Sequence, residues 1–311
     1  MGWKQRLEYW GVRSGLGLSR LLPRSALYAL ASRIVEGSFG PGSRRHRRVL
    51  EHLAIAFPGA SQEELEALAV RYRWHKAHFF AETVLMLTGR FDYEGSVVKL
   101  DEARERIAAL KGRSGKGILF LVSHYGNWEF LAQFFALNGF PGTLVAKEHR
   151  RNPLIDERII GPYRQGFGHR VVERKGALRA IARIFREGGG VGMHIDQMIP
   201  PPNGVEIDFF GRPAYAAKSM AQLKLRFDPL VVPIFAVREG RERFRILIGE
   251  PEEYRAEEME DADEKVRCIT QSYTDLLVGQ IRREPAQWEW SYRRWRMPKG
   301  TVGKEAQSAG R

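Results

Sequence analysis

The feature that most constrains the fold of this chain is an apolar strand pattern that passes directly into a helix pattern. Residues 117–122 (GILFLV) are short and apolar enough for a buried strand, and residues 130–137 place apolar side chains at spacings of three and four. Asn127 is a suitable N-cap, and Gly139 follows the last residue of the helix pattern. We therefore expect a strand, a tight connection, and a helix at residues 127–137.

A histidine and a carboxylate lie in the connection between these two elements. His124 falls where the strand ends, and Glu129 falls in the first turn of the helix. Five positions across such a turn can bring the two side chains together, so that Glu129 would fix the tautomer of His124 and stabilise its protonated form. His124 could then take a proton from a bound hydroxyl. The alternative is a loop histidine and a carboxylate that the helix dipole favours.

Strand and helix patterns alternate along the rest of the chain. Strands are predicted at residues 117–122, 143–146, 170–172, 191–195, 230–237 and 243–248, and helices at 61–87, 100–110, 127–137, 153–165, 176–187 and 264–282. This order favours an α/β fold with a mixed, largely parallel central sheet flanked by helices. Sites in open α/β sheets gather at the carboxyl ends of strands, where both His124 and Asp196 fall.

The charge of the chain indicates an anionic partner. The formal net charge is +13 with a pI near 10.0, which suits nucleic acid, an anionic membrane surface, or an acidic protein or substrate. The sequence has no zinc-finger spacing, no RNP-like motif and no convincing helix-turn-helix, so we expect no nucleic acid. We also expect no metal site, because the eight histidines show no ligand spacing with the lone cysteine. That cysteine, Cys268, excludes an intrachain disulfide, and we expect it to be a buried structural thiol.

The first forty residues combine aromatic, leucine and basic side chains. Interrupting charges leave no run of eighteen apolar residues, so no transmembrane helix is predicted. Such a segment can lie in the headgroup region of a membrane, or it can pack on the protein's own core. A break in composition at residues 37–48 then divides the chain into a helical membrane-associating segment (1–40), a main domain (41–298) and a disordered tail (299–311).

These motifs carry a family resemblance. A histidine followed after four residues by Asp or Glu resembles the signature of the glycerolipid and lysophospholipid acyltransferases, and SHYGNWE at residues 123–129 is similar to one branch, the late acyltransferases of lipid A biosynthesis. Further strings that resemble this branch lie at residues 51–58, 152–156, 196–197, 209–213 and 285–295. The resemblance covers nearly the whole chain.

The resemblance implies a membrane enzyme that moves an acyl chain from an acyl carrier protein thioester to a hydroxyl of a lipid A precursor or related glycolipid. It implies His124 as general base supported by Glu129, no cofactor beyond the thioester, and a place on the cytoplasmic face of the inner membrane. Arg164 would hold an acceptor phosphate or polarise the thioester oxygen, and the amides of Gly126 and Asn127 could also stabilise the oxyanion. Asp196 would orient a substrate hydroxyl or pair with Arg164.

Several alternatives stay open at this point. The acceptor could instead be a phosphoinositol mannoside or a lysophospholipid, with coenzyme A as donor, or the protein could be a non-enzymatic membrane or nucleic-acid binder. Arg164 could be an ordinary solvated arginine, and Arg150 and Arg151 are weaker candidates for its role. Phe209 and Phe210 could line an acyl channel or pack in the core. The aromatic and basic residues of segment 288–296 could form a stacking surface, a headgroup-level patch or a structural element.

Overall fold

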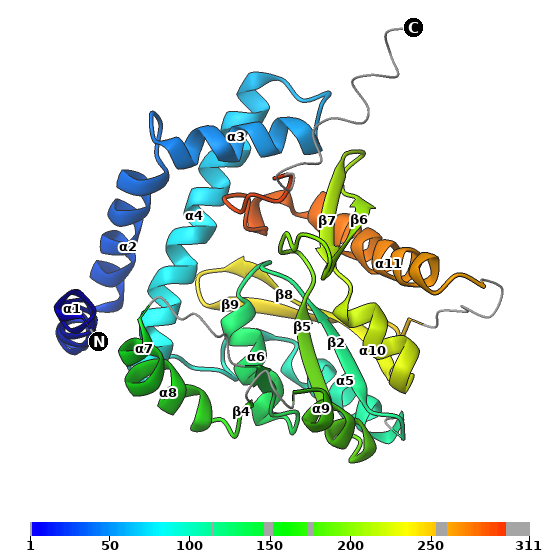
Figure 1. The fold of residues 1–311 in the computed structure, drawn as a ribbon. Coiled ribbons are helices and arrows are strands. Elements are labelled where there is room, and N and C mark those ends of the chain that lie inside the picture. Colours follow the sequence, from blue (N-terminus) through cyan, green and yellow to red (C-terminus); the bar gives the residue numbers. More distant parts are fainter. Residues whose placement is uncertain (1, 114, 146–151, 173–176, 253–259, 297–311) are drawn as a thin grey trace, which may run out of the picture.

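The protein is built on a five-stranded central sheet. The computed structural model describes residues 2–113, 115–145, 152–172, 177–252 and 260–296. The strand order is β1 (Val97–Val98), β9 (Arg243–Ile248), β8 (Leu230–Gly240), β2 (Ile118–Val122) and β5 (Gly190–His194). Every neighbouring pair is parallel except β8 and β9, which pair antiparallel. The prediction of a mixed, largely parallel sheet flanked by helices is confirmed (Figure 1).

Side chains of β2 alternate between two hydrophobic cores, one on each face of the sheet. Ile118 and Phe120 pack in the core formed with α6 (Trp128–Leu137), α5 (Leu100–Arg113) and the later turns of α4 (Gln62–Leu87). Leu119 and Leu121 pack in the other core, which α11 (Ala262–Arg283), α3 (Arg44–Ala56), α9 (Ala177–Arg186) and α10 (Ser219–Phe227) help to form. A strand buried on both faces accounts for the continuous apolar run of residues 118–121.

Two short sheets and a few irregular helical turns complete the fold. β3 (Thr143–Val145) and β4 (Arg170–Val172) form a parallel pair, and β6 (Gly204–Asp208) and β7 (Pro213–Ala217) form a hairpin. The helix predicted at residues 153–165 is present as α7 (Pro153–Ile155), a π-helical turn (Asp156–Ile160) and α8 (Gly161–Gln165). A 3-10 helix (Pro285–Gln287) leads into the C-terminal segment. The sequence patterns did not predict α3, α10 or β7.

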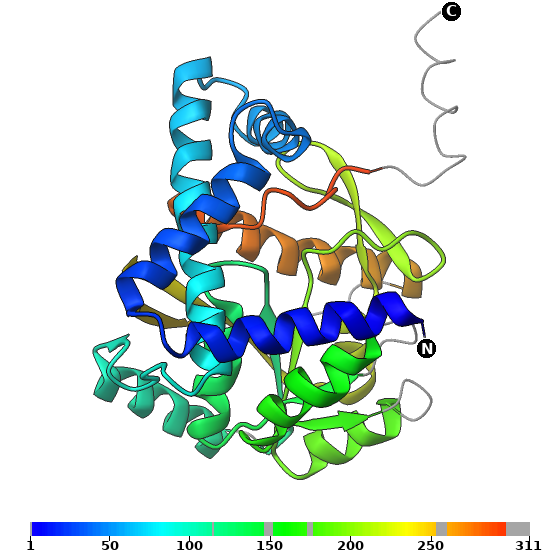
Figure 2. The ribbon, with the colours of Figure 1, turned by 90° about the vertical axis from the view of Figure 1, so that its left-hand side faces the viewer.

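The N-terminal segment forms two helices that relate differently to the main domain. α2 (Arg24–Phe39) packs along α4, and its Leu27, Tyr28 and Ala31 join the core. α1 (Trp3–Ser19) crosses the molecule beside α7 (Figure 2). The composition break is a short turn at residues 40–43 between α2 and α3. None of the helices that the structure describes has the length and hydrophobicity of a membrane span. The predicted disordered tail lies outside the described residues.

Candidate active site

His124 is held at the end of the central sheet by a buried aspartate from the neighbouring strand. β2 and β5 pair in register through Val122 and His194, so the residues two positions further on lie side by side. The Nδ1 atom of His124 lies 2.8 Å from Oδ1 of Asp196, and the backbone N–H of His124 donates to Oδ2 at 2.7 Å. Both contacts depend on the register of two strands more than seventy residues apart in sequence.

Asp196 is fully buried and charged. Trp288 Nε1 donates to its Oδ2 at 3.0 Å. Burial opposes ionisation of this carboxyl, but the charge and hydrogen bonds of His124, with a smaller contribution from His194, lower its pKa to about 2. An ionised Asp196 accepts a hydrogen bond from the Nδ1–H group of His124. The lone pair of the imidazole ring therefore lies on Nε2. No hydrogen bond to Nε2 is made within the described part of the chain.

Aromatic side chains surround the His124 ring. Trp128 and Tyr292 meet it edge to face, with ring centroids 5.0 and 4.7 Å away, and His194 stacks on it at 4.2 Å. The backbone N–H of Glu289 donates to the His124 carbonyl oxygen at 3.0 Å. Residues 288–292 therefore fix both the ring and the main chain of His124.

A cavity of about 300 Å³ adjoins His124. Its polar lining includes His124, Glu129, Arg164 and Tyr292, and its apolar lining comes largely from α4 and the α7–α8 region: Phe79, Met86, Leu87, Trp128 and Ile160, together with Thr83 and Tyr163. Arg164 Nη2 donates to Glu129 Oε1 at 3.1 Å, and both side chains are about a quarter to a third exposed. The cavity thus combines a histidine, one ion pair and a hydrophobic wall.

The two carboxylates take different partners from those expected. The sequence predicted that Glu129 would contact His124 and that Asp196 could pair with Arg164. In the structure Asp196 contacts His124 and Glu129 pairs with Arg164. The physical reason is the register of β2 and β5, which turns Nδ1 of His124 toward Asp196, whereas the first turn of α6 leaves Glu129 at the cavity wall within reach of Arg164.

Gly126 and Asn127 have structural roles instead of the predicted oxyanion contacts. The Gly126 N–H donates to the Gln287 carbonyl at 3.0 Å, and the Asn127 N–H points to the Ala236 carbonyl at 3.4 Å. Gly126 has φ +59°, and a Cβ there would lie 1.9 Å from the Ala236 oxygen, so the position requires glycine. Asn127 caps α6, as predicted, by accepting the Phe130 N–H at 2.9 Å.

A buried ion pair that sequence patterns did not suggest supports this turn. Glu82 of α4 and Arg238 of β8 are both buried and form a bidentate salt bridge, with one contact at 2.6 Å. The second amide atom of Asn127, Nδ2, donates to Glu82 at 2.7 Å. The charges themselves gave no sequence signal, because a helical glutamate and a strand arginine are ordinary surface residues.

The polar cluster at the strand ends is poorly arranged for a metal ion. Ligand atoms of His124, His194 and Asp196 lie within 4.8 Å of one another. However, the two imidazole rings stack at an interplanar angle of 29°, so their in-plane lone pairs do not converge. Both oxygens of Asp196 already accept hydrogen bonds from His124 and Trp288.

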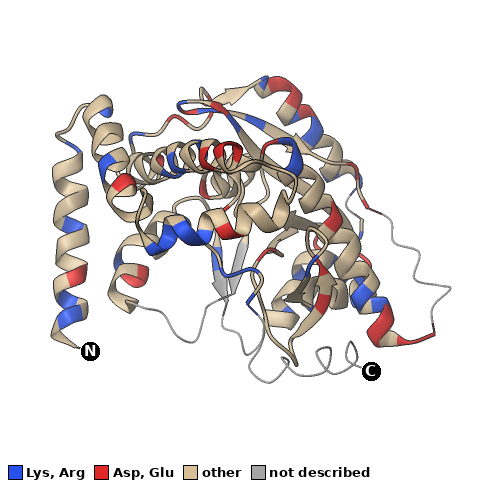
Figure 3. Ribbon diagram, turned by 90° about the horizontal axis from the view of Figure 1, so that it is seen from above, with Lys and Arg blue, Asp and Glu red and all other residues tan. Residues whose placement is uncertain are grey.

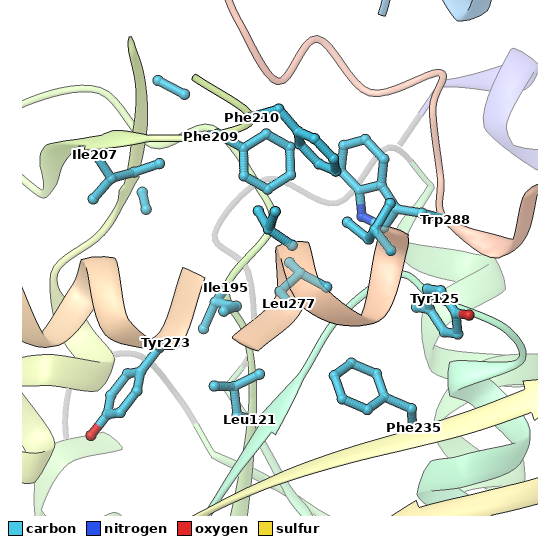
Figure 4. Packing of buried hydrophobic residues seen from close by; sticks show 14 of the residues in the cluster. Leu121, Tyr125, Ile195, Ile207, Phe209, Phe210, Phe235, Tyr273, Leu277 and Trp288 are labelled. Atoms are coloured by element: carbon cyan, nitrogen blue, oxygen red, sulfur yellow. The ribbon is translucent and has the colours of Figure 1, made fainter. Parts of the chain in front are cut away.

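The structure decides two alternatives that the sequence left open and corrects one prediction. Phe209 and Phe210 pack in the core, where Figure 4 shows them beside Trp288, and neither lines the cavity beside His124. Trp288, Trp290 and Arg294 are buried, which favours the structural role of their segment over a stacking surface or a headgroup-level patch. Cys268 was predicted to be buried, but it is only half-buried and lies at the wall of a separate groove beneath α11. Arg150 and Arg151 lie outside the described residues.

Known proteins are similar to this chain over nearly its whole length. The profile of the family described as bacterial lipid A biosynthesis acyltransferase matches residues 4–297. A phosphatidylinositol mannoside acyltransferase of Mycolicibacterium smegmatis is 23% identical over 92% of this chain and 90% of its own length. A lipid A biosynthesis myristoyltransferase of Escherichia coli K12 is 23% identical over 91% of this chain and 86% of its own. The chain therefore belongs to the bacterial lipid A biosynthesis acyltransferase family and is an acyltransferase.

Proposed function

We propose that this enzyme transfers a fatty acyl chain from an acyl carrier protein thioester to a hydroxyl of a lipid A precursor or a related glycolipid. The observation that carries the proposal is the state of His124: Nδ1 is engaged by an ionised Asp196, and the ring lines a cavity whose wall is largely apolar. An imidazole held in this way is a general base for an alcohol. The apolar wall suits a hydrocarbon chain.

In the proposed reaction, Nε2 of His124 takes the proton of the acceptor hydroxyl. The hydroxyl oxygen attacks the thioester carbonyl carbon at the same time. The new C–O bond gives a tetrahedral intermediate, which collapses by breaking the C–S bond. The departing thiolate takes the proton back from Nε2, so His124 returns to its starting state. Asp196 stays ionised throughout and stabilises the imidazolium.

Arg164 is the group in the cavity best suited to a phosphate of the acceptor lipid. A guanidinium is always charged and presents its N–H donors in a fork that matches a phosphate. Glu129 holds Arg164 through the contact at 3.1 Å and thus supports substrate binding by Arg164 and not proton transfer by His124. The charge that develops on the thioester oxygen is the alternative partner of Arg164.

The charge and the N-terminus support a peripheral site on the cytoplasmic face of the inner membrane. The net charge of +13 complements both an acidic carrier protein and an anionic lipid. In α1, Trp3, Leu7 and Trp10 are 71%, 65% and 57% exposed, and their spacing places them on one face. An exposed tryptophan and leucine face suits a helix that lies in the headgroup region.

Purified enzyme incubated with isotope-labelled acyl carrier protein thioester and a total bacterial lipid extract should yield an acylated glycolipid by mass spectrometry. His124→Ala protein, folded by circular dichroism, is the control and should yield none. Equal product from both proteins, or no product in any extract with a folded enzyme, would refute the proposal.

A phosphatidylinositol mannoside acceptor with coenzyme A as donor is the second candidate. Its acceptor is supported by the mycobacterial relative, which is named for phosphatidylinositol mannoside and is as similar to this chain, at 23% identity, as the E. coli relative. Supplying acyl-coenzyme A or acyl carrier protein at equal concentration, with lipid A precursor or phosphatidylinositol mannoside, separates the four combinations.

A further inference from the structure

We propose that the cleft between α1 and α7 is a binding site for the phosphate of an anionic phospholipid headgroup. This proposal rests on the proposed membrane association and adds a defined ligand site to it. The cleft encloses about 260 Å³ and is lined by Arg6, Tyr9, Trp10, Leu154 and Arg158. Two arginines, two aromatic rings and one leucine are the side chains that a phosphate with an attached glycerol and acyl chain would contact.

The cleft is formed before any ligand binds, because α1 is fixed to the start of α7. Asn152, which is buried, donates through Nδ2 to the Gln5 carbonyl at 2.9 Å and to Glu8 Oε2 at 3.0 Å. Tyr9 is also buried in this contact. The same bonds turn the Glu8 carboxylate toward Asn152, and Glu8 does not line the cleft. A preformed site avoids the entropic cost of ordering its side chains on binding.

The cleft is lined by two arginines and, among the residues that the structure describes, by no carboxylate. Arg13 donates to the Tyr9 hydroxyl at 3.1 Å, and the Arg158 guanidinium lies 5.8 Å from the Tyr9 ring centre. Within the described residues, Arg6, Arg13 and Arg158 form no ion pair with a carboxylate. The hydrogen bond from Arg13, with the charges of Arg13 and Arg158, lowers the pKa of the Tyr9 hydroxyl, although desolvation opposes the shift.

The position of the cleft on α1 selects a lipid phosphate. Trp3, Leu7 and Trp10 follow one another at spacings of four and three, and Arg6, Tyr9 and Arg13 at spacings of three and four, so they form two neighbouring faces of the helix. The charged bands of α1 are visible in Figure 3. With the tryptophan face in the headgroup region, the arginine face lies at the depth of the phosphates. Arginine binds phosphate through two parallel N–H donors.

This site would also orient the active-site cavity. Arg158 lines the cleft between α1 and α7, and Ile160 lines the cavity beside His124. Both residues belong to the π-helical turn. A headgroup bound to Arg158 therefore holds the turn that forms one wall of the active site against the membrane surface. An acceptor lipid embedded in that surface would meet the cavity without leaving the bilayer.

The test is binding of the full-length protein to phosphatidylcholine vesicles with and without phosphatidylglycerol, measured by co-sedimentation. A generic surface charge contributes about 1 kcal/mol, or roughly fivefold in binding. The matched control Arg20→Gln removes an exposed charge at the end of α1 that does not line the cleft, and it should weaken binding by about fivefold or less. Arg158→Gln and Arg6→Gln should each weaken binding more than tenfold, and Arg158→Lys should not restore it.

Three results would overturn the proposal. Equal losses in Arg158→Gln and Arg20→Gln would reduce the effect to net charge. Release of wild-type protein by millimolar inorganic phosphate at constant ionic strength would make a free anion the ligand. The site would also be refuted if wild-type protein bound vesicles equally well with and without phosphatidylglycerol but still acylated a detergent-dispersed acceptor. That result would leave the proposed reaction intact. Selective vesicle binding without any acyl transfer would refute the reaction and leave this site.

Discussion

Asp196 and Glu129 both follow strands of the central sheet at their carboxyl ends, but their environments are opposite. Asp196 has no exposed surface and accepts three hydrogen bonds from protein donors, two from His124 and one from Trp288. Glu129 has a side chain that is 26% exposed and one partner, Arg164, which is itself 30% exposed. One carboxylate is fixed in the core, and the other lies at the cavity wall.

The difference separates two tasks. A carboxylate that is fixed and ionised before substrate arrives can set the tautomer of a base without reorganising during the reaction. A solvent-accessible ion pair contributes little to stability, so it can exchange its partners for substrate atoms at little cost. We therefore expect substitutions on the Asp196 side to affect turnover and folding, and substitutions on the Arg164 side to affect substrate binding.

The largest effect should come from removing the base. His124→Ala should lower kcat by about 10⁴-fold, because proton transfer by a positioned group contributes up to that amount. Steady-state kinetics with acyl carrier protein thioester would measure it. His194→Gln is the matched control, because this ring stacks on His124 but does not line the cavity. A similar loss in both variants would assign the proton transfer to the stacked pair.

The turn that carries His124 should also depend on the buried ion pair of Glu82 and Arg238. Glu82→Ala leaves Arg238 without its partner in the core and should destabilise the protein by about 3–5 kcal/mol in urea unfolding. Glu284→Ala, which removes the exposed partner of Arg71, should cost less than about 1 kcal/mol. Comparable values for the two variants would contradict the structural importance assigned to Glu82.

Asp196→Asn should lower kcat by about 10²- to 10⁴-fold with little change in KM. The amide keeps the shape of the side chain but loses the charge that stabilises the imidazolium. Glu129→Gln should instead raise KM more than it lowers kcat. If Asp196→Asn mainly raised KM and Glu129→Gln mainly lowered kcat, the assignment of Asp196 to His124 and of Glu129 to Arg164 would be wrong.

The ionisation of Asp196 should make the free energy of unfolding depend on pH between about pH 4 and pH 2. Its pKa is about 2 in the folded protein and about 3.9 in an unfolded chain, so its contribution is fully present above pH 4 and is lost as the pH falls toward 2. The difference in unfolding free energy between wild type and Asp196→Asn should therefore shrink by about 2 kcal/mol from pH 5 to pH 2. If this difference in unfolding free energy did not change with pH, Asp196 would not have a lowered pKa in the folded protein.

The smallest effect should appear on the exposed side. Arg164→Lys keeps the charge but loses the guanidinium fork, and it should raise KM by about tenfold. Isothermal calorimetry with a non-reactive acceptor analogue would check that binding and not chemistry has changed. Arg179→Lys on α9, away from the cavity, should leave KM unchanged.

Local patterns predicted most of the elements but not the partners within the site. The strand at residues 118–122 and the cap at Asn127 follow from neighbouring residues, and both were predicted. The contact between His124 and Asp196 depends on β2 and β5 being adjacent and in register, which no local pattern contains. Once that register is known, the contact follows, because each residue lies two positions beyond a paired strand end.

Buried polar residues were the least predictable part of the fold. Glu82 and Arg238 have sequence environments typical of exposed residues, and only the packing of α4 against β8 makes them a pair. Trp288 was identified as part of an aromatic and basic segment, but its partner Asp196 lies 92 positions earlier in the chain. Such contacts between distant segments are visible only in three dimensions.

The segment that completes the site follows every strand of the central sheet along the chain. Trp288 supplies a donor to Asp196, Glu289 secures the carbonyl of His124, and the Trp290 carbonyl contacts His52 of α3 at 2.8 Å. Residues 288–292 belong to no strand of the sheet, so their local detachment would leave the sheet intact and release the base. The activity of the enzyme should therefore be lost at milder denaturant concentrations than the signal of the sheet itself.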